Sequence, residues 1–186
     1  MDNGACSYRR FLEGDDNGIV EIIRDYKDGL TLFLLHYAGD LHTAEELTED
    51  TFFRLVTRKP HFTAKYSFKT WLYTIGRNLA LNHLKRAKKL QPVTCEELAA
   101  IRSDKASLEE SYLQKEQKIL LHRALSKITP AYSNVLHLKF LEEMTNEQIA
   151  AVMKKSKRQI ENLIYQAKRS LKSELEREGF HYEGLS

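Results

Sequence analysis

The chain is poor in the residues that break helices and in those that build redox or metal centres. Its 186 residues include only 3 Pro, 8 Gly and 2 Cys. Scarce Pro and Gly leave long stretches free to form helices, and the abundant Leu, Glu, Lys and Ala favour them. The two cysteines show neither CxxC nor Cys/His spacing, which excludes a zinc finger and a disulfide framework. The sequence predicts an all-α protein of a reducing compartment.

Long apolar runs and catalytic patterns are also missing. No run of about 18 apolar residues occurs, and the first ten residues lack the apolar core of a signal peptide. We therefore expect a soluble, cytoplasmic protein with no membrane insertion. The 7 histidines show neither a nucleophile pairing nor a metal-ligand spacing, and no Gly-rich phosphate loop exists. We expect no enzyme, no metal, no cofactor and no small-molecule substrate.

Acidic residues are absent from the stretch between Thr57 and Lys89, which carries nine Lys or Arg residues and five aromatic ones. The stretch before it, Asp40 to Val56, has five acidic residues and a single basic one. A net charge of +3 therefore hides a strongly polarised chain. Such polarity indicates a polyanion as one binding partner.

Hydrophobic spacing predicts two helical domains, residues 1–90 and 112–186, joined by a linker over 91–111 that holds at most short helical turns. The first domain is expected to contain helices near 19–37, 43–56 and 68–89. The second is expected to begin with helices over 112–128 and 130–141. We expect Thr43 to start its helix in a capping box with Glu46, and Ser67 to cap the helix after it.

Two capping boxes close together predict a helix-turn-helix at the end of the second domain. Thr145 with Gln148 starts one short helix, and Ser156 with Gln159 starts another a few residues later. The second helix has an apolar face and an opposite face rich in basic and polar side chains, as a recognition helix in the major groove requires. A helical hairpin with a solvated basic face is the alternative.

The long helix of the first domain divides into an anchor and a reading surface. Its first turns carry an apolar arc formed by Phe68, Trp71, Leu72, Ile75 and Leu79. Further on, a stripe of polar residues succeeds the arc, consisting of Asn78, Asn82, Lys85 and Lys89. Asn bonds base edges and Lys holds phosphates, so the stripe favours DNA reading. In the preceding loop, the sequence is compatible with two roles for Phe62: its ring either stacks on an unpaired base or fills space in the hydrophobic core.

Two blocks of this sequence resemble conserved regions of bacterial RNA polymerase sigma factors of the extracytoplasmic-function group, a branch of the sigma-70 family. TAEELTEDTFFRLV followed by YSFKTWLYTIGRNLALNHLKRAKK resembles their second region. ALSKITPAYSNVLHLKFLEEMTNEQIAAVMKKSKRQIENLIYQAKRSL resembles their fourth. Together the blocks cover most of the chain, in the family's order and separation.

The resemblance implies a sigma factor that binds core RNA polymerase and promoter DNA, and that an anti-sigma factor masks. Docking on the clamp helices of the β′ subunit is implied for Glu46, Glu49, Asp50 and Phe53. Reading of the single-stranded minus-10 element is implied for Phe62, Lys65, Asn78, Asn82, Lys85 and Arg86. Reading of the duplex minus-35 element, beside the β flap, is expected of Lys157, Arg158, Gln159, Glu161, Asn162, Tyr165 and Lys168.

The recognition helix departs from the family pattern at Glu161 and Leu163, where many members carry basic residues. Glu161 either accepts a hydrogen bond from cytosine N4 or stays a bystander. Two other functions remain open. A stand-alone dimeric helix-turn-helix regulator would bind duplex DNA without polymerase, whereas an anti-sigma or adaptor protein would bind polymerase without directing transcription.

Overall fold

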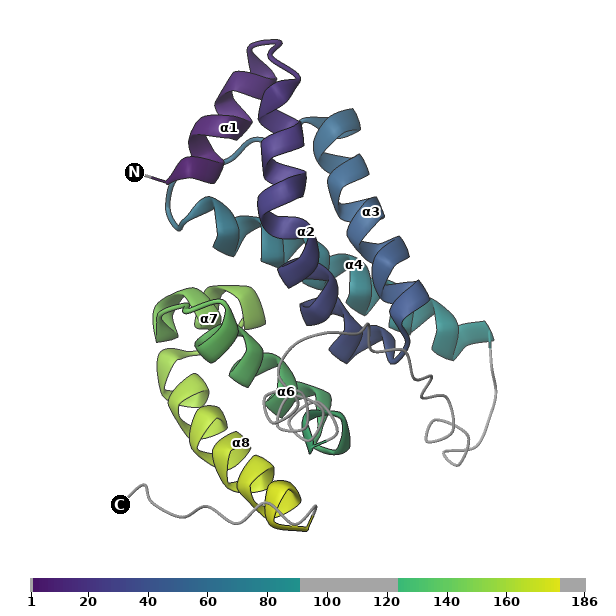
Figure 1. Ribbon diagram of the computed structural model, residues 1–186, viewed down its shortest axis with the longest axis vertical. Coiled ribbons are helices and arrows are strands. Elements are labelled where there is room, and N and C mark those ends of the chain that lie inside the picture. Colours follow the sequence, from purple (N-terminus) through teal and green to yellow (C-terminus); the bar gives the residue numbers. More distant parts are fainter. Residues whose placement is uncertain (1, 91–123, 178–186) are drawn as a thin grey trace, which may run out of the picture.

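The computed structural model describes residues 2–90 and 124–177, with side chains up to residue 87 in the first range, and every regular element in these ranges is a helix. Figure 1 shows two groups of helices. The first group consists of α1 (Asn3–Leu12), α2 (Asn17–Ala38), α3 (Leu41–Arg58) and α4 (Phe68–Leu90). The second consists of α6 (Pro130–Leu136), the π-helix η2 (His137–Leu141), α7 (Asn146–Met153) and α8 (Lys157–Arg177).

The expected fold class, two small all-α domains of which the second carries a helix-turn-helix, is confirmed. The predicted linker, residues 91–111, and the predicted helix from 112 as far as residue 123 lie outside the described residues. The boundaries 1–90, 91–111 and 112–186 therefore stay predictions.

The sequence does not predict α1, whose ten residues carry few apolar side chains. Two of these, Tyr8 and Phe11, are buried. The Tyr8 hydroxyl donates to the carbonyl of Pro60 at 2.8 Å, and its ring centroid lies 5.3 Å from that of Trp71. The helix thus holds the loop before α4 and the first turns of α4 in place.

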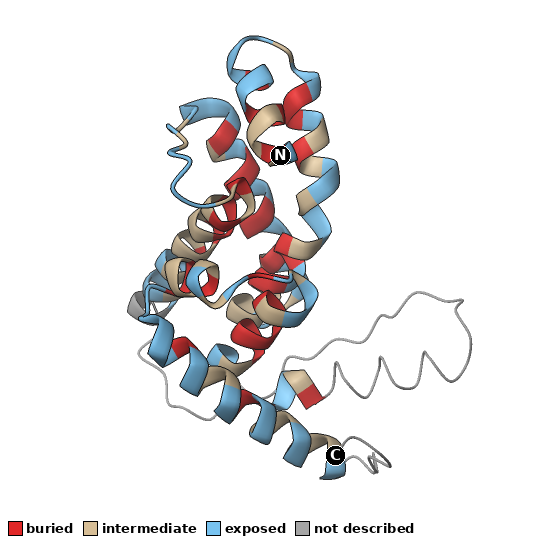
Figure 2. Cartoon of the chain, turned by 90° about the vertical axis from the view of Figure 1, so that its left-hand side faces the viewer, coloured by how far each residue is buried: buried red, intermediate tan, exposed pale blue. Residues whose placement is uncertain are grey.

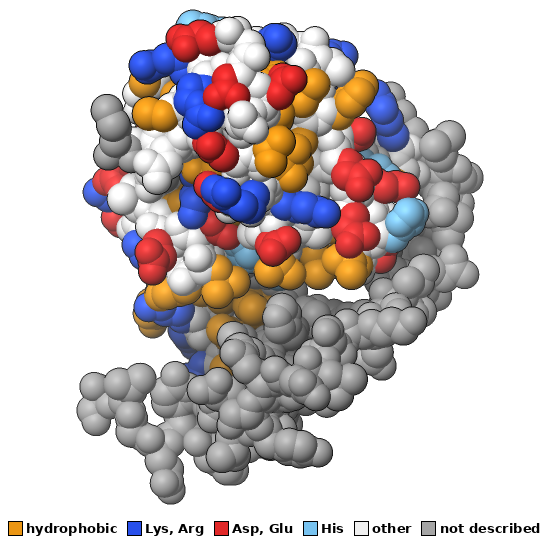
Figure 3. All heavy atoms as spheres, turned by 45° about the horizontal axis from the view of Figure 1, so that its top comes forward, with side chains coloured by type: hydrophobic (Ala, Val, Ile, Leu, Met, Phe, Trp, Pro, Cys, Tyr) orange, Lys and Arg blue, Asp and Glu red, His pale blue; other side chains and the backbone are white. Residues whose placement is uncertain are grey.

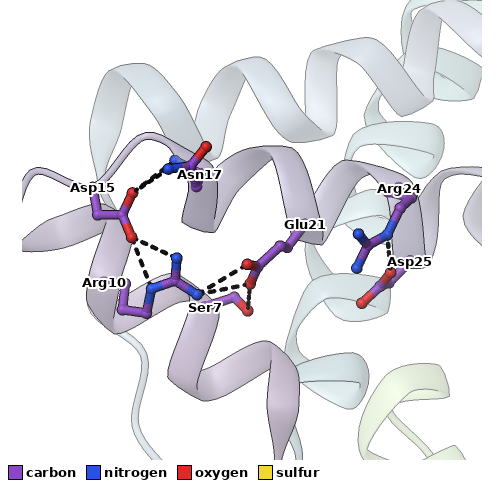
Figure 4. A network of polar contacts seen from close by, with 7 residues as sticks. All are labelled: Ser7, Arg10, Asp15, Asn17, Glu21, Arg24 and Asp25. Atoms are coloured by element: carbon purple, nitrogen blue, oxygen red, sulfur yellow. Dashed lines mark hydrogen bonds and ion pairs between the residues drawn. The ribbon is translucent and has the colours of Figure 1, made fainter.

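A polar network fastens α1 to α2 (Figure 4). The Arg10 guanidinium donates to Asp15 through Nε at 2.8 Å and to Glu21 through Nη1 at 2.9 Å. The Ser7 hydroxyl donates to the same Glu21 carboxylate at 2.6 Å. The contact with Arg10 and Asn17 lowers the pKa of the Asp15 carboxyl. The network fixes the turn between the two helices.

The core of the first group lies between α2, α3 and α4, and Figure 2 shows buried residues concentrated in the interior of the molecule. Its fully enclosed side chains include Leu30, Phe33, Leu34, Leu55, Phe68 and Leu72. Gly76 lets α4 approach α2 closely, because a Cβ there would lie 3.1 Å from Cδ1 of Leu30. In the predicted arc of α4, Trp71, Ile75 and Leu79 are half-buried against this core.

The start of α3 corrects one prediction. The helix begins at Leu41, and the capping residue is Asp40, whose carboxylate accepts from the backbone N–H of Thr43 at 2.9 Å. Thr43 is therefore inside the first turn and forms no capping box with Glu46. The cap on α4 is as expected, since Oγ of Ser67 accepts from the N–H of Thr70 at 3.3 Å.

The second group contains both predicted capping boxes. The backbone N–H of Thr145 donates to Oε1 of Gln148 at 2.8 Å, and the N–H of Ser156 donates to Oε1 of Gln159 at 2.8 Å. The reciprocal bonds measure 3.3 and 3.2 Å. One feature differs from expectation, because the predicted helix over 130–141 changes to π geometry at His137.

The two groups pack against each other, with α7 on α4 and both α6 and η2 on α2. The buried residues of both groups form one continuous cluster. Tyr73 illustrates the consequence, since it lies outside the apolar arc predicted for α4 and is nevertheless fully buried. The sequence periodicity of α4 indicates only one buried face. A second face, which contains Tyr73, is buried because the second group of helices packs on it.

Candidate nucleic-acid and protein interfaces

The last turns of α4 present the predicted reading stripe. Asn82 and Lys85 are exposed, as is Arg86 beside them, whereas Asn78 is half-buried. Because these residues succeed one another by about one helical turn, Asn78, Asn82 and Lys85 share one face of the helix. The side chain of Lys89, which completes the predicted stripe, lies outside the described ones. The face offers amide groups followed by cations, a sequence of contacts suited to bases and then phosphates.

The loop before α4 places its two central aromatics differently. Phe62 is half-buried, with its ring centroid 5.3 Å from that of Trp71 and 5.7 Å from that of Phe68. Tyr66 is 39% exposed, and Nζ of Lys65 lies 5.6 Å from its ring centroid. An exposed ring beside a cation is the arrangement that holds an unpaired base.

The structure thus places Phe62 at the edge of the core. This position favours the core-filling role over stacking on a base, two alternatives that the sequence did not distinguish. The sequence indicates aromatic residues beside cations throughout this loop, but it does not single out Tyr66 as a site residue. The available signal was its distance from the apolar arc of α4, since a ring outside the arc has no helix face to bury it.

The acidic helix α3 turns its predicted docking residues outward. Glu46, Glu49, Asp50 and Phe53 are all exposed, and Phe53 keeps 65% of its surface accessible. Figure 3 shows acidic side chains gathered on one flank of the molecule next to hydrophobic ones. An exposed Phe amid carboxylates is an unfavourable surface for a lone protein and a suitable one for an interface.

A shallow hollow beside Phe53 completes this surface. It is lined on the α3 side by Thr48, Glu49, Phe52, Phe53 and Val56, and on the α2 side by Ile23 and Lys27. The sequence did not predict that α2 contributes to this hollow. Ile23 belongs to the apolar stripe of that helix, and such a position predicts a buried core residue. In the structure Ile23 is only partly covered. The hollow makes the surface both apolar and concave.

The recognition helix α8 presents every predicted minus-35 residue to solvent, namely Lys157, Arg158, Gln159, Glu161, Asn162, Tyr165 and Lys168. Its inner face is anchored by Ile160 and Ala167, which are fully buried. The oxygen of Gln159 is used in the capping box, so its amide NH₂ is the group it offers outward. A buried apolar face opposite an exposed polar face is typical of the recognition helix of a helix-turn-helix.

Lys157 and Lys168 of α8 contact residues of the preceding helices. Lys157 pairs with Glu147 of α7, and this contact raises the pKa of Lys157 and lowers that of Glu147. Nζ of Lys168 lies 5.0 Å from the ring centroid of Phe140, which is 53% exposed. The first contact ties the start of α8 to α7, so the two helices present one surface.

Within residues 2–90 and 124–177, no group of three or more His, Cys, Asp or Glu side chains is placed to hold a metal ion. Of the helices that the structure describes, none combines the length and the apolar character needed to cross a bilayer.

Comparison with known families gives two matches. Residues 22–90 match the model for Sigma-70 region 2, and residues 118–171 match the model for Sigma-70, region 4. The first match contains α3 and α4 with the loop between them, and the second contains the helix-turn-helix. The matched regions therefore include all of the exposed candidate residues.

Individual relatives agree with these matches. The chain is 30% identical to the ECF RNA polymerase sigma factor BldN of Streptomyces coelicolor over 87% of its own length and 62% of that protein's. It is 26% identical to the RNA polymerase sigma factor YlaC of Bacillus subtilis, over 86% of its own length and 92% of that protein's. It thus spans less than two thirds of BldN and nearly all of YlaC.

The fold has a solved counterpart. The sigma factor RpoE of Bartonella quintana, crystallised with the anti-sigma factor NepR, superimposes with a TM-score of 0.67 at 21% identity, over 84% of this chain and 95% of RpoE. At this identity the likeness concerns the fold alone. It shows that the two helical groups described above form a known architecture.

Proposed function

The chain belongs to the extracytoplasmic-function group of the sigma-70 family of RNA polymerase sigma factors, and on this premise we propose that it directs core RNA polymerase to specific promoters. The minus-35 element is read as duplex and the minus-10 element as single strand. The observation that carries the proposal is the presence, in one chain, of an acidic and apolar face on α3, a basic face on α4 and a helix-turn-helix. The protein acts in the cytoplasm by binding, not by catalysis, and needs no cofactor.

The proposed division of labour follows the predicted domains. Residues 1–90 dock on the polymerase and read the minus-10 element, residues 91–111 link the domains, and residues 112–186 read the minus-35 element. On α3 the exposed Glu46, Glu49 and Asp50 supply charge for the β′ clamp helices, with Phe53 as the apolar anchor. Buried aromatic anchors with a charged rim are typical of strong protein interfaces.

On α4 and its loop, single-stranded DNA follows the basic surface. Lys65 and Tyr66 hold an unpaired base by charge and stacking, and Phe62 supports them from the edge of the core. Asn78 and Asn82 contact base edges, while Lys85 and Arg86 hold the backbone. The absence of acidic residues from Thr57 to Lys89 keeps repulsion of the strand low.

At the other end of the protein, α8 enters the major groove of the minus-35 element. Its first turn brings Lys157 and Arg158 to the duplex, and Asn162 and Tyr165 follow on the same exposed face. Glu161 lies among these cations and is placed to accept from cytosine N4. Contact between this domain and the β flap, and masking of the exposed surfaces by an anti-sigma factor, complete the proposed partners.

Polymerase docking is tested by titrating labelled core RNA polymerase with the wild-type chain and with Phe53→Ala. We expect the substitution to weaken binding by about 1–2 kcal/mol, because an exposed aromatic anchor is lost without any change to the core. Leu12→Ala, which also trims an exposed apolar side chain, is the matched control. Equal affinities for Phe53→Ala and wild type would overturn the role assigned to α3.

The stand-alone dimeric regulator is not favoured, since the relatives of the whole chain are sigma factors. A gel-shift experiment separates the two functions. A sigma factor retards promoter duplex strongly only together with core polymerase, whereas a dimeric regulator retards the duplex by itself.

A further inference from the structure

One carboxylate caps two helices that are far apart in the sequence. Oδ1 of Asp2 accepts from the backbone N–H of Ala5 at 3.3 Å, in the first turn of α1, and Oδ2 accepts from the backbone N–H of Phe68, the first residue of α4. The first N–H groups of a helix have no partner within it, so an acceptor for them helps to fix where the helix begins. Ser67 accepts from the N–H of Thr70, and Asp2 accepts from that of Phe68. The start of α4 therefore depends on α1.

The same helix holds the other end of the loop between α3 and α4. The hydroxyl of Tyr8 donates to the carbonyl of Pro60 at 2.8 Å, just after the end of α3, and its ring centroid lies 5.5 Å from that of Phe68. Next to this contact, Nζ of Lys59 lies 5.0 Å from the ring centroid of Phe11. Two buried aromatic side chains of α1 thus contact the residues that lead into the loop.

The backbone of α1 lies close to the start of α4 at Gly4. A Cβ at that position would lie 2.5 Å from Cδ1 of Phe68 and 2.6 Å from the hydroxyl oxygen of Tyr26. A larger residue would have to displace one of these two rings. The absence of a side chain therefore lets α1 pack directly on the first residue of α4.

Between these contacts the loop forms an arch, residues 63–66, whose side chains are all exposed. The arch contains Lys65 and Tyr66, to which the unpaired base is assigned above. Its own backbone contributes a hydrogen bond from the N–H of Lys65 to the carbonyl of Thr63 at 2.7 Å. An exposed arch of four residues buries little apolar surface, so its shape depends on how its two ends are held.

Resting on the proposed reading of the minus-10 element, we propose that α1 is a brace for this loop and that Asp2 and Tyr8 are its positioning residues. Without touching DNA, they hold the arch in the shape in which Lys65 and Tyr66 take up the unpaired base. When a contact of the brace is lost, a smaller fraction of the molecules has this shape. The affinity for the base then falls by the same factor, because only the competent fraction binds.

The effect of the brace on the free protein is measured through Trp71, the single tryptophan of the chain. Its ring centroid lies 5.3 Å from those of Tyr8 and Phe62, so its fluorescence reports on the base of the loop. Tyr8→Phe removes only a hydroxyl, and Asp2→Asn leaves one acceptor oxygen for two N–H groups. We expect acrylamide to quench Trp71 more strongly in both variants. Ser7→Ala removes a hydroxyl that α1 donates to Glu21 of α2, and should leave the quenching unchanged.

The effect on base capture is measured by titrating holoenzyme with forked promoter DNA that carries an abasic site at each unpaired minus-10 position in turn. The base held by the arch is the one whose removal weakens binding by wild type but not by Tyr66→Ala, since the two changes then remove the same contact. With this base present, Tyr8→Phe and Asp2→Asn should each weaken binding by about fivefold, the usual effect of one hydrogen bond on an equilibrium. Binding of the matching abasic DNA should not change, and Ser7→Ala should bind both DNAs like wild type.

Wild-type affinity for the intact DNA in both variants would overturn the brace. An equal loss of affinity for intact and abasic DNA would also overturn it, because a general weakening of the fold affects both DNAs alike. The same holds if no base depends on Tyr66. The proposed function fails in a different way, namely if wild-type holoenzyme does not bind promoter DNA at all.

Discussion

Single residues on the basic surface of α4 are expected to make two kinds of DNA contact. Asn78 is held half-buried, where a fixed amide distinguishes one base edge from another, whereas Lys85 is exposed and free to follow a phosphate. A fixed hydrogen-bonding group reads sequence, and a flexible cation supplies affinity to any sequence. We therefore expect the difference in burial between these two side chains to correspond to a difference in function.

Alanine substitutions separate the two contacts. Asn78→Ala should reduce the preference for the correct minus-10 base by about 1–3 kcal/mol, because a positioned base contact is lost. Lys85→Ala should weaken binding to all sequences alike and lower the slope of log affinity against log salt by about 1. Both are measured by titrating holoenzyme with forked promoter DNA at several salt concentrations. Identical effects of the two substitutions would contradict this division.

Helix by helix, the short capping boxes were predictable and the surrounding elements less so. The Thr145 and Ser156 boxes depend on residues three positions apart, so local sequence contains the whole signal. The same rule was wrong for Thr43, because the extended Asp40 directly before the helix takes the capping position. Helix α1 escaped prediction since its stability comes from Tyr8 and Phe11 packing on distant residues and not from its own composition.

The cap on α7 should stabilise the helix-turn-helix measurably. Thr145→Ala removes the hydroxyl that accepts from the N–H of Gln148, and we expect a loss of about 1 kcal/mol in the free energy of unfolding. The comparison is Thr63→Ala, a change of the same atoms in an exposed loop residue. Denaturant unfolding followed by far-ultraviolet circular dichroism gives both values. A loss no larger than that of Thr63→Ala would show that the cap is dispensable.

In the whole molecule, exposed acidic side chains lie on α3 and exposed basic ones on the end of α4, and we propose that each partner meets a different face. The acidic α3 and the basic end of α4 are consecutive in sequence, and their opposite charges were visible there. The contact between the domains could not be predicted from the sequence, because Glu142 and Lys69 are 73 residues apart. Neither segment has a local sequence pattern that indicates the other as its partner. Only the tertiary arrangement shows that Tyr73 and Gly29 face another domain.

The ion pair between Glu142 after η2 and Lys69 on α4, with only 10% of the Glu142 side chain exposed, makes the folded protein sensitive to acid. Burial by itself raises the pKa of the Glu142 carboxyl, but the contacts with His137, Lys69 and Tyr73 outweigh it and lower the pKa from its ordinary 4.5 to about 2. Tyr26 of α2 also faces this charge. A lowered pKa stabilises the folded protein fully above pH 4.5, and this contribution is lost as pH falls from 4.5 toward 2.

The free energy of unfolding, measured with denaturant across this pH range for wild type and Glu142→Gln in parallel, checks the effect. Other carboxylates titrate in the same window, so the expected signal is the difference between the two proteins. The advantage of wild type over Glu142→Gln should shrink steadily below pH 4.5. A difference that stays constant down to pH 2.5 would mean that the charge of the Glu142 carboxylate does not stabilise the fold.

The central claim is that this chain gives core RNA polymerase the ability to start at particular promoters. It is tested most directly by transcription with purified core polymerase on a library of promoter sequences, with and without the protein. We predict transcripts only when the protein is present, from templates that share one minus-35 and one minus-10 sequence, and their loss when either sequence is scrambled. Tight binding to core polymerase without any promoter-dependent transcript would contradict the account.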